Sequence, residues 1–138
     1  AIGAKIAHPD KPVVCFAGDG GFMMGVSELA TAMMYGVNVV TVVVNDGALT
    51  AIKGSQRKGC DGRTIDTDLY NPDFIQFAKS FGAYTARVDD LENFERILKE
   101  ALAANSPAVI EIPMQDKQNN LIDIIGWLQP EPLRKTKF

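Results

Sequence analysis

A run of six residues, 39–44, is apolar or β-branched at every position and ends in the polar turn Asn45-Asp46-Gly47. Such a continuous run is typical of a parallel strand covered by helices on both faces, because a strand with one face in water alternates polar and apolar residues. A second run of this kind, residues 12–17, ends in Gly18-Asp19-Gly20-Gly21. These runs predict a buried parallel sheet with polar turns at the ends of two strands.

Helical patterns separate the predicted strands along the chain. Apolar residues recur at helical spacing after the first glycine turn, and a glycine follows them where a helix commonly ends. An Asn-Pro pair is a strong helix start, with the asparagine as the cap and the proline at the first helical position. Helices are therefore predicted over 26–36, from Asn71-Pro72 to Gly82, and over 94–102 after a cap at Asp89 or Asp90; further strands are predicted at 84–88 and 108–112.

The alternation of strands and helices predicts an α/β fold, a three-layer parallel sheet sandwiched by helices as in Rossmann-like or flavodoxin-like domains. We assign this domain to residues 1–128 and expect residues 129–138 to form a flexible tail. No alternating strand follows Asn45-Asp46-Gly47 to complete a hairpin. Residues 48–53 come next, and the polar, glycine-bearing stretch from there to Asp68 is predicted to be a loop. The 138 residues suffice for one domain of this kind and leave no room for a second.

Composition argues against several classes of partner. The net charge of -3 gives no overall basic field, so we expect no nucleic-acid partner. No apolar run approaches the roughly 20 residues that cross a bilayer, so we expect no membrane association. Cys15 and Cys60 lack the paired spacing of a zinc or iron–sulfur site and do not indicate a disulfide framework, which favours a cytoplasmic location.

The two polar turns form the candidate site. Ligands of open parallel sheets bind beyond the carboxyl ends of the strands, and glycine-rich turns that open a helix offer backbone amides to phosphate. A hard cation such as Mg²⁺ takes oxygen ligands, usually one or two from the protein and the others from phosphate and water. Asp19, Asn45 and the carbonyl of Gly47 would supply such oxygens if the side chains of residues 19 and 45 converge.

Each turn also has a simpler interpretation. Gly18-Asp19-Gly20-Gly21 alone is typical of an ordinary strand-to-helix turn, and Asn45-Asp46-Gly47 alone of a plain turn. Glu28 lies near a helix start, where a carboxylate interacts favourably with the helix dipole, so a structural role is favoured over acid–base chemistry. The basic residues of the 53–63 segment indicate either a mobile lid over an anion or a solvated loop; they are Lys53, Arg57, Lys58 and Arg63.

The two turns together match a known pattern. Gly18-Asp19-Gly20 is followed by 24 residues and then by Asn45, with a strand before each turn and the helical segment Glu28-Leu29-Ala30-Thr31-Ala32 between them. This arrangement resembles the thiamine-diphosphate (ThDP) binding motif of the acetolactate synthase, benzoylformate decarboxylase and pyruvate decarboxylase superfamily. The resemblance covers residues 1–113.

The resemblance implies a cofactor, a metal and roles for particular residues. ThDP and Mg²⁺ would bind together at the two turns, and the aspartate that stands at position 46, where the family often has a second asparagine, need not touch the metal. The implied metal ligands are Asp19, the side chain of Asn45 and the carbonyl of Gly47; the implied cofactor-binding residues are these three with Gly18, Gly20, Gly21, Ala48 and Leu49.

The same resemblance implies a lyase or transferase domain that acts on 2-oxo acids by decarboxylation or carboligation. The activating glutamate of this superfamily lies on a pyrimidine-binding domain, usually of another subunit. No catalytic residue is therefore expected in this chain, which would need that partner domain or subunit in an oligomer. Two alternatives remain: the β-type subunit of a 2-oxo acid:ferredoxin oxidoreductase, whose usual cluster-binding cysteines are missing here, and a non-catalytic flavodoxin-like module that binds nucleotides or anions.

Overall fold

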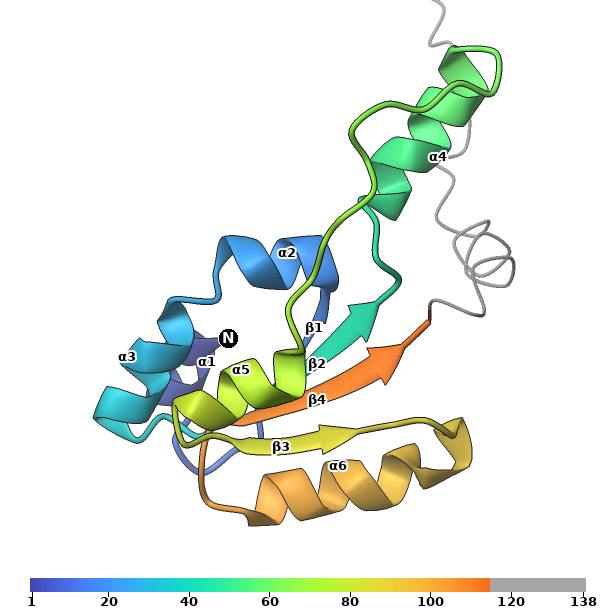
Figure 1. Ribbon diagram of the computed structural model, residues 1–138. Coiled ribbons are helices and arrows are strands. Elements are labelled where there is room, and N and C mark those ends of the chain that lie inside the picture. The colour runs from blue at the N-terminus through green and yellow to red at the C-terminus, as the bar shows by residue number, and fades with distance from the viewer. Residues whose placement is uncertain (115–138) are drawn as a thin grey trace, which may run out of the picture.

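The computed structural model describes residues 1–114, which form a parallel sheet with helices on both faces (Figure 1). The expected α/β architecture is therefore confirmed, whereas the predicted domain end at residue 128 and the tail at 129–138 lie outside the described residues. The elements in chain order are α1 (Ile2–Ala7), β1 (Val14–Gly18), α2 (Asp19–Met24), α3 (Glu28–Tyr35), β2 (Val40–Asn45), α4 (Thr50–Gly59), α5 (Phe74–Ser80), β3 (Tyr84–Arg87), η1 (Leu91–Asn93), α6 (Phe94–Ala103) and β4 (Ala108–Pro113).

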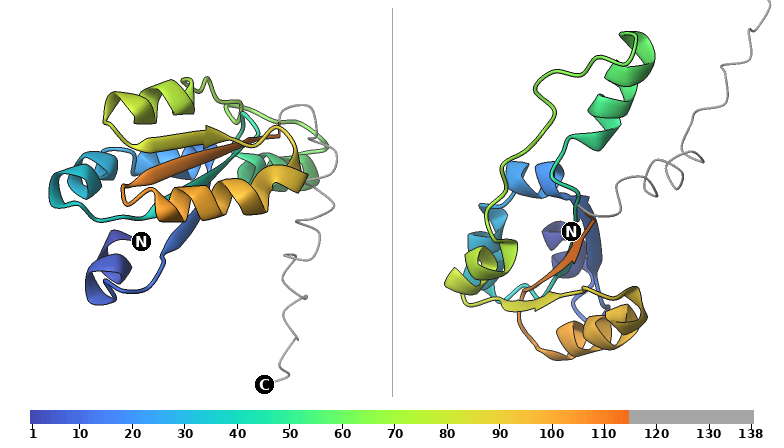
Figure 2. Two further views of the ribbon diagram at one scale, coloured as in Figure 1. Left: turned by 90° about the horizontal axis from the view of Figure 1, so that it is seen from below. Right: turned by 45° about the vertical axis from the view of Figure 1, so that its right-hand side comes forward.

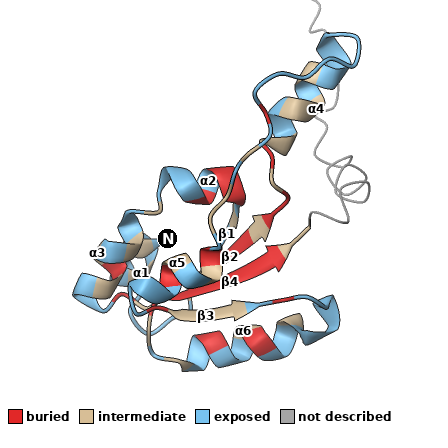
Figure 3. Cartoon of the chain, viewed as in Figure 1, coloured by how far each residue is buried: buried red, intermediate tan, exposed pale blue. Residues whose placement is uncertain are grey.

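The four described strands are all parallel and lie in the order β1-β2-β4-β3. The central strands β2 and β4 are buried along most of their length, as the red segments of Figure 3 show. Buried parallel strands need apolar side chains on both faces, which explains the unbroken β-branched run that precedes Asn45. The chain passes from β2 to β3 and then returns to place β4 between them.

The described residues form apolar cores on opposite faces of the sheet, beneath the helices that Figure 2 shows on its two sides. On one face the strands pack against α6 through Ile97 and Ala101. On the other face Val43 and Val109 pack against Phe74 of α5 and Phe22 of α2, whose rings meet edge to face at 5.4 Å. Side chains alternate between the faces of a strand, so the odd-numbered residues of β2 and β4 share the α2 and α5 face.

The helix after the first strand differs from the prediction. We expected a single helix over 26–36, whereas the structure has α2 from Asp19 and a separate α3, with Gly25 at the end of α2. Gly36 ends α3 as predicted, in the left-handed conformation with φ of 61°. Glycine adopts that conformation without the steric cost that a Cβ would add.

A second difference concerns the start of α5. Its cap is Asp73, whose carboxylate accepts a hydrogen bond of 2.9 Å from the backbone N–H of Gln76, rather than Asn71 as predicted. The helix therefore begins at Phe74, two residues beyond Pro72. An aspartate caps a helix as well as an asparagine does. Asn71 is consequently available for contacts elsewhere.

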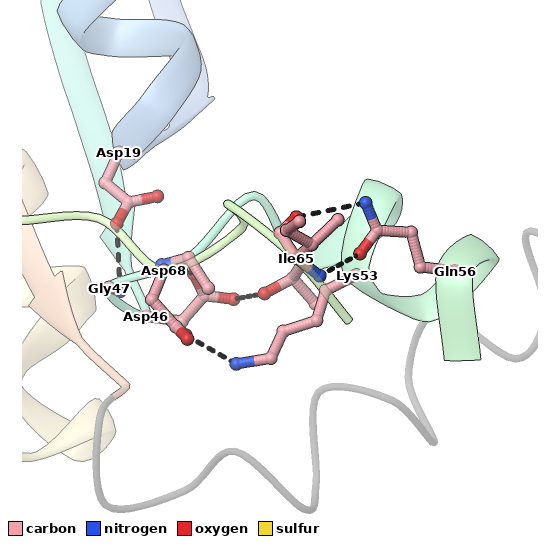
Figure 4. Close-up of polar contacts among 9 residues, drawn as sticks. Asp19, Asp46, Gly47, Lys53, Gln56, Ile65 and Asp68 are labelled. Carbon is pink, nitrogen blue, oxygen red and sulfur yellow. Dashed lines mark hydrogen bonds and ion pairs between the residues drawn. The ribbon is translucent and has the colours of Figure 1, made fainter. Parts of the chain in front are cut away.

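The third difference lies before Asp68, where the ten-residue helix α4 occupies the first part of the predicted polar loop. Its lysine, arginine and glutamine residues are good helix formers, and they sustain the helix despite its two glycines. No residue of α4 is buried, and the helix extends away from the sheet in Figure 1 and in the right-hand view of Figure 2. Lys53 of α4 forms an ion pair with Asp68, and the side chain of Gln56 forms hydrogen bonds with the backbone of Ile65 (Figure 4). These contacts hold α4 against residues 65–68, where the chain runs back toward the sheet.

Candidate functional site

The parallel register brings the predicted polar turns to one edge of the sheet. Gly18 of β1 pairs with Val44 of β2, and Asn45 pairs with Pro113 of β4. Asp19 follows the last residue of β1 directly, and Asn45 is the last residue of β2. Both side chains therefore start from neighbouring strand ends, where ligands of parallel sheets bind.

Asp19 is almost completely buried, with 2% of its surface exposed. Its Oδ1 accepts a hydrogen bond from the N–H of Gly20 at 2.9 Å. Its Oδ2 accepts one from the N–H of Gly47 at 2.9 Å, drawn in Figure 4, and another from Nδ2 of Asn71 at 2.6 Å. Three donors thus compensate the cost of burying this carboxylate.

Asn45 shares a donor with Asp19. The Oδ1 of Asn45 accepts a hydrogen bond of 2.9 Å from Nδ2 of Asn71, the same nitrogen that bonds Oδ2 of Asp19. The two oxygens must therefore face a common point, because one amide nitrogen reaches both. The predicted convergence of residues 19 and 45 is present in the structure, and the amide of Asn71 lies where they meet.

Gly47 shapes the turn after β2. Its φ of 72° lies in the left-handed region, which favours glycine at this position. Its N–H donates to Asp19, and its carbonyl accepts a hydrogen bond of 2.8 Å from the N–H of Leu69. A carbonyl oxygen has two lone pairs, so this bond leaves one for a further partner.

Asp46 also shapes the turn after β2. Its carboxylate accepts a hydrogen bond of 3.1 Å from the N–H of Ala48 and another from the hydroxyl of Thr50.

Two clefts flank the pair formed by Asp19 and Asn45. One, of about 400 Å³, is lined by six of the eight residues predicted to bind the cofactor. They are Gly18, Asp19, Gly20, Gly21, Ala48 and Leu49. The other, of about 560 Å³, is lined by Asn45 and by residues 69–73. A Cβ added at Gly20 would lie 2.6 Å from a methyl carbon of Leu49, whereas one at Gly21 would meet nothing within 4 Å. Only glycine therefore fits at position 20 without moving Leu49.

Sequence reasoning missed three residues of this site: Asn71, Glu111 and Arg87. Glu111 is 3% exposed, and its Oε1 accepts a hydrogen bond of 2.7 Å from Nδ2 of Asn45. Nε of Arg87 donates a hydrogen bond of 2.9 Å to Oε2 of Glu111, and Nη2 forms an ion pair with the same oxygen at 2.9 Å. The hydrogen bond to Glu111 raises the pKa of Arg87 above its ordinary value. A charged residue inside the apolar strand β4 was the available signal, because a buried carboxylate needs partners.

Two other predicted features have simpler surroundings. Glu28 lies in the first turn of α3 and is exposed, which agrees with the expected structural role. Lys53 forms an ion pair with Asp68, and Arg63 donates a hydrogen bond to the carbonyl of Cys60. Both side chains therefore contact other residues of the same segment, 53–68.

Cys15 and Cys60 are both free thiols. Within residues 1–114, no helix has the length and apolar character needed to cross a membrane.

The donor set fits a hard cation next to a phosphate. Asp19 and Asn45 present a carboxylate oxygen and an amide oxygen to one point, and the Gly47 carbonyl lies in the same turn; oxygens of these types are the ligands that Mg²⁺ takes. The cleft beside this point is lined by the backbone of the glycine turn, and a turn of this kind that opens a helix offers amides to a phosphate. A parallel α/β sheet with an oxygen-rich site at its carboxyl edge defines a cofactor-binding domain of the doubly wound class.

The comparisons with known proteins identify the family. The model of the C-terminal TPP-binding domain of thiamine pyrophosphate enzymes matches residues 1–112, and the chain belongs to this family, whose cofactor is thiamine diphosphate. The acetolactate synthase large subunit of Parasynechococcus marenigrum is 36% identical over 121 residues, which cover 86% of this chain and 20% of that protein. The acetolactate synthase of Bacillus subtilis is 34% identical over 119 residues, which cover 86% of this chain and 21% of that protein.

A solved structure supports the same assignment. The thiamine diphosphate-dependent 4-hydroxybenzoylformate decarboxylase of Rhodococcus jostii RHA1 superposes with a TM-score of 0.76 at 34% identity. The match covers 82% of this chain and 21% of that chain. The present chain thus spans about a fifth of the length of these relatives, so it corresponds to one part of such an enzyme.

Proposed function

We propose that this chain binds the diphosphate of ThDP together with Mg²⁺ and forms part of an enzyme that acts on 2-oxo acids. The observation that carries the proposal is the convergence of Asp19 Oδ2 and Asn45 Oδ1 on a single nitrogen, that of Asn71. Two protein oxygens facing one point at the carboxyl edge of a parallel sheet suit a cation that bridges phosphate oxygens. Membership of the TPP-binding family supplies the identity of the cofactor.

The predicted residues take defined roles in this proposal. Asp19, the side chain of Asn45 and the carbonyl of Gly47 would hold the ion. The ion would neutralise part of the diphosphate charge, and the backbone around Gly18, Gly20 and Gly21 would contact the remainder. Ala48 and Leu49, which line the cleft beside the glycine turn, would lie along the phosphate arm.

The reaction belongs to the whole enzyme rather than to this chain. When bound, ThDP supplies a carbon nucleophile and an electron sink for the decarboxylation or carboligation of a 2-oxo acid. We propose an acetolactate synthase-like lyase or transferase, because two of the relatives named above are acetolactate synthases. This chain would anchor the cofactor, and a pyrimidine-binding partner domain or subunit, in an oligomer, would supply the activating glutamate. We expect the isolated chain to be catalytically silent.

Calorimetry tests the proposal. We expect ThDP to bind the 138-residue chain only when Mg²⁺ is present, and Asp19→Ala to abolish that binding because it removes the single carboxylate of the ligand set. Asp10→Ala, an equal change at an exposed position, serves as the matched control and should bind as the wild type does. Circular dichroism of each variant establishes that it is folded.

Two outcomes would contradict the proposal. Binding of other nucleotides without metal, and no binding of ThDP, would favour a flavodoxin-like binding module. Turnover of pyruvate by this chain without an added subunit would contradict the requirement for a partner domain.

A further inference from the structure

The orientation of the Asn45 amide determines whether this residue can serve as a metal ligand. An asparagine side chain carries an oxygen, which accepts hydrogen bonds and can bind a cation, and an NH₂ group, which only donates. The two ends have nearly the same shape, so packing alone does not distinguish them. A group that accepts but cannot donate is needed on the side away from the metal.

Glu111 is such a group. Its carboxylate accepts a hydrogen bond of 2.7 Å from Nδ2 of Asn45. If the amide of Asn45 were turned over, its oxygen would face a carboxylate oxygen at this distance, and its NH₂ would face the NH₂ of Asn71. Both contacts would be repulsive. Glu111 therefore directs Oδ1 of Asn45 toward Asp19 and Asn71.

Strand register holds Glu111 in place. Glu111 of β4 pairs with Val43 of β2 on one side and with Arg87 of β3 on the other. Asn45 lies two residues after Val43, so Asn45, Glu111 and Arg87 share one face of the sheet. The guanidinium of Arg87 donates a hydrogen bond to Glu111 from Nε and forms an ion pair with it through Nη2; it also forms an ion pair with Asp73, the cap of α5, at 3.6 Å. A buried carboxylate of this kind is stable only with such a partner.

We infer that Glu111, held by Arg87, is a positioning residue that turns the Asn45 oxygen toward the metal. The inference rests on the proposed function, because it assigns Glu111 a purpose only if Asn45 binds the ion. Residues that orient metal ligands through hydrogen bonds typically change metal affinity by about 10- to 100-fold when they are replaced.

Glu111→Gln tests the inference with little change in volume. Arg87 can only donate, so the new amide must present its oxygen to Arg87 and its NH₂ to Asn45. Asn45 must then turn its own oxygen away from the metal site. We expect the Mg²⁺ concentration that half-saturates ThDP binding to rise about 10- to 100-fold in calorimetric titrations. Glu95→Gln, which alters an exposed ion pair with Lys99 on α6, is the matched control and should leave it unchanged.

A second variant separates positioning from a structural contribution. In the double variant Asn45→Asp with Glu111→Gln, one oxygen of residue 45 accepts from the new amide and the other faces the metal. We expect its Mg²⁺ requirement to return close to that of the wild type. Asn45→Asp alone places two carboxylates together and should unfold at lower urea concentration. If the double variant binds Mg²⁺ no better than Glu111→Gln alone, or if Glu111→Gln binds as the wild type does, the inference is wrong.

A readout without ThDP tests the orientation itself. In the wild type, the Asn45 NH₂ protons are bonded to a buried carboxylate, and NMR should show them protected from exchange with solvent. Glu111→Gln should shift these signals, because the amide of Asn45 turns over. Unchanged signals would overturn the inference even if the wild type binds ThDP with Mg²⁺. A wild type that fails to bind ThDP would instead contradict the proposed function, on which the inference depends.

Discussion

Nδ2 of Asn71 lies 2.6 Å from Oδ2 of Asp19, although 52 positions separate the two residues in the chain. The same nitrogen bonds Oδ1 of Asn45 at 2.9 Å. A hydrogen-bond donor therefore stands between the two oxygens that are proposed to hold a cation. A bound cation and this NH₂ group would compete for the same oxygens.

This competition predicts the effect of Asn71→Ala. We expect the Mg²⁺ affinity measured with ThDP to rise by up to about tenfold, which corresponds to about 1.4 kcal/mol, because no donor has to be displaced. Without metal, the free energy of unfolding should fall by about 1 to 2 kcal/mol, since two hydrogen bonds are lost, one of them to a charged group. Calorimetry and urea unfolding measure the two effects. A lower Mg²⁺ affinity would mean that Asn71 helps to hold the ion.

The glycines of α2 should respond differently to alanine. Gly20→Ala places a Cβ against Leu49, and we expect it to lower the free energy of unfolding by about 1 to 3 kcal/mol through overpacking. Gly21→Ala meets no atom within 4 Å and should raise it by up to about 1 kcal/mol, because alanine favours the helix. Urea unfolding of both variants makes the comparison. Equal effects would show that Leu49 moves aside without cost.

Thr67 offers a test of a buried polar group. Its hydroxyl is buried and forms no hydrogen bond with the described part of the chain, while its residue is 2% exposed. Thr67→Val keeps the shape and removes the unpaired hydroxyl, so we expect the free energy of unfolding to stay the same or rise by about 1 kcal/mol. Thr64→Val, at an exposed position, is the control for the substitution itself. A marked loss of stability would reveal a partner for the hydroxyl.

Tyr84 should contribute to the pH dependence of stability in alkali. Burial, followed by the charge and hydrogen bond of Glu100, raises its pKa above the ordinary value of 10.0. A group with a raised pKa in the folded state contributes stability that is present below its unfolded pKa and is lost as the pH rises through the folded value. We expect stability to fall above pH 10.0 and Tyr84→Phe to flatten this decline. Phenolate absorbance should place the Tyr84 titration lower after Glu100→Gln, though not at its ordinary value.

The four strands and the helices α3, α5 and α6 were predictable from the sequence because their causes are local, whereas α2 was not predicted as a separate helix and α4 was predicted as a loop. The β-branched run before Asn45 and the apolar spacing of α6 each depend on a few consecutive residues. The convergence of Asp19 and Asn45 was also predictable, because parallel strands end at the same edge of a sheet. The family resemblance then implied the cofactor that the comparisons support.

The tertiary structure decided which other residues join the site. Asn71 follows local helix-start rules, yet its amide binds Asp19 and Asn45, and Asp73 caps the helix in its place. Glu111 reaches Asn45 and Arg87 only because β4 lies between β2 and β3. Residue periodicity determines which side chains share a face of one strand, but strand order determines which strands are neighbours. That order depends on contacts between residues far apart in the chain, and no local pattern encodes them.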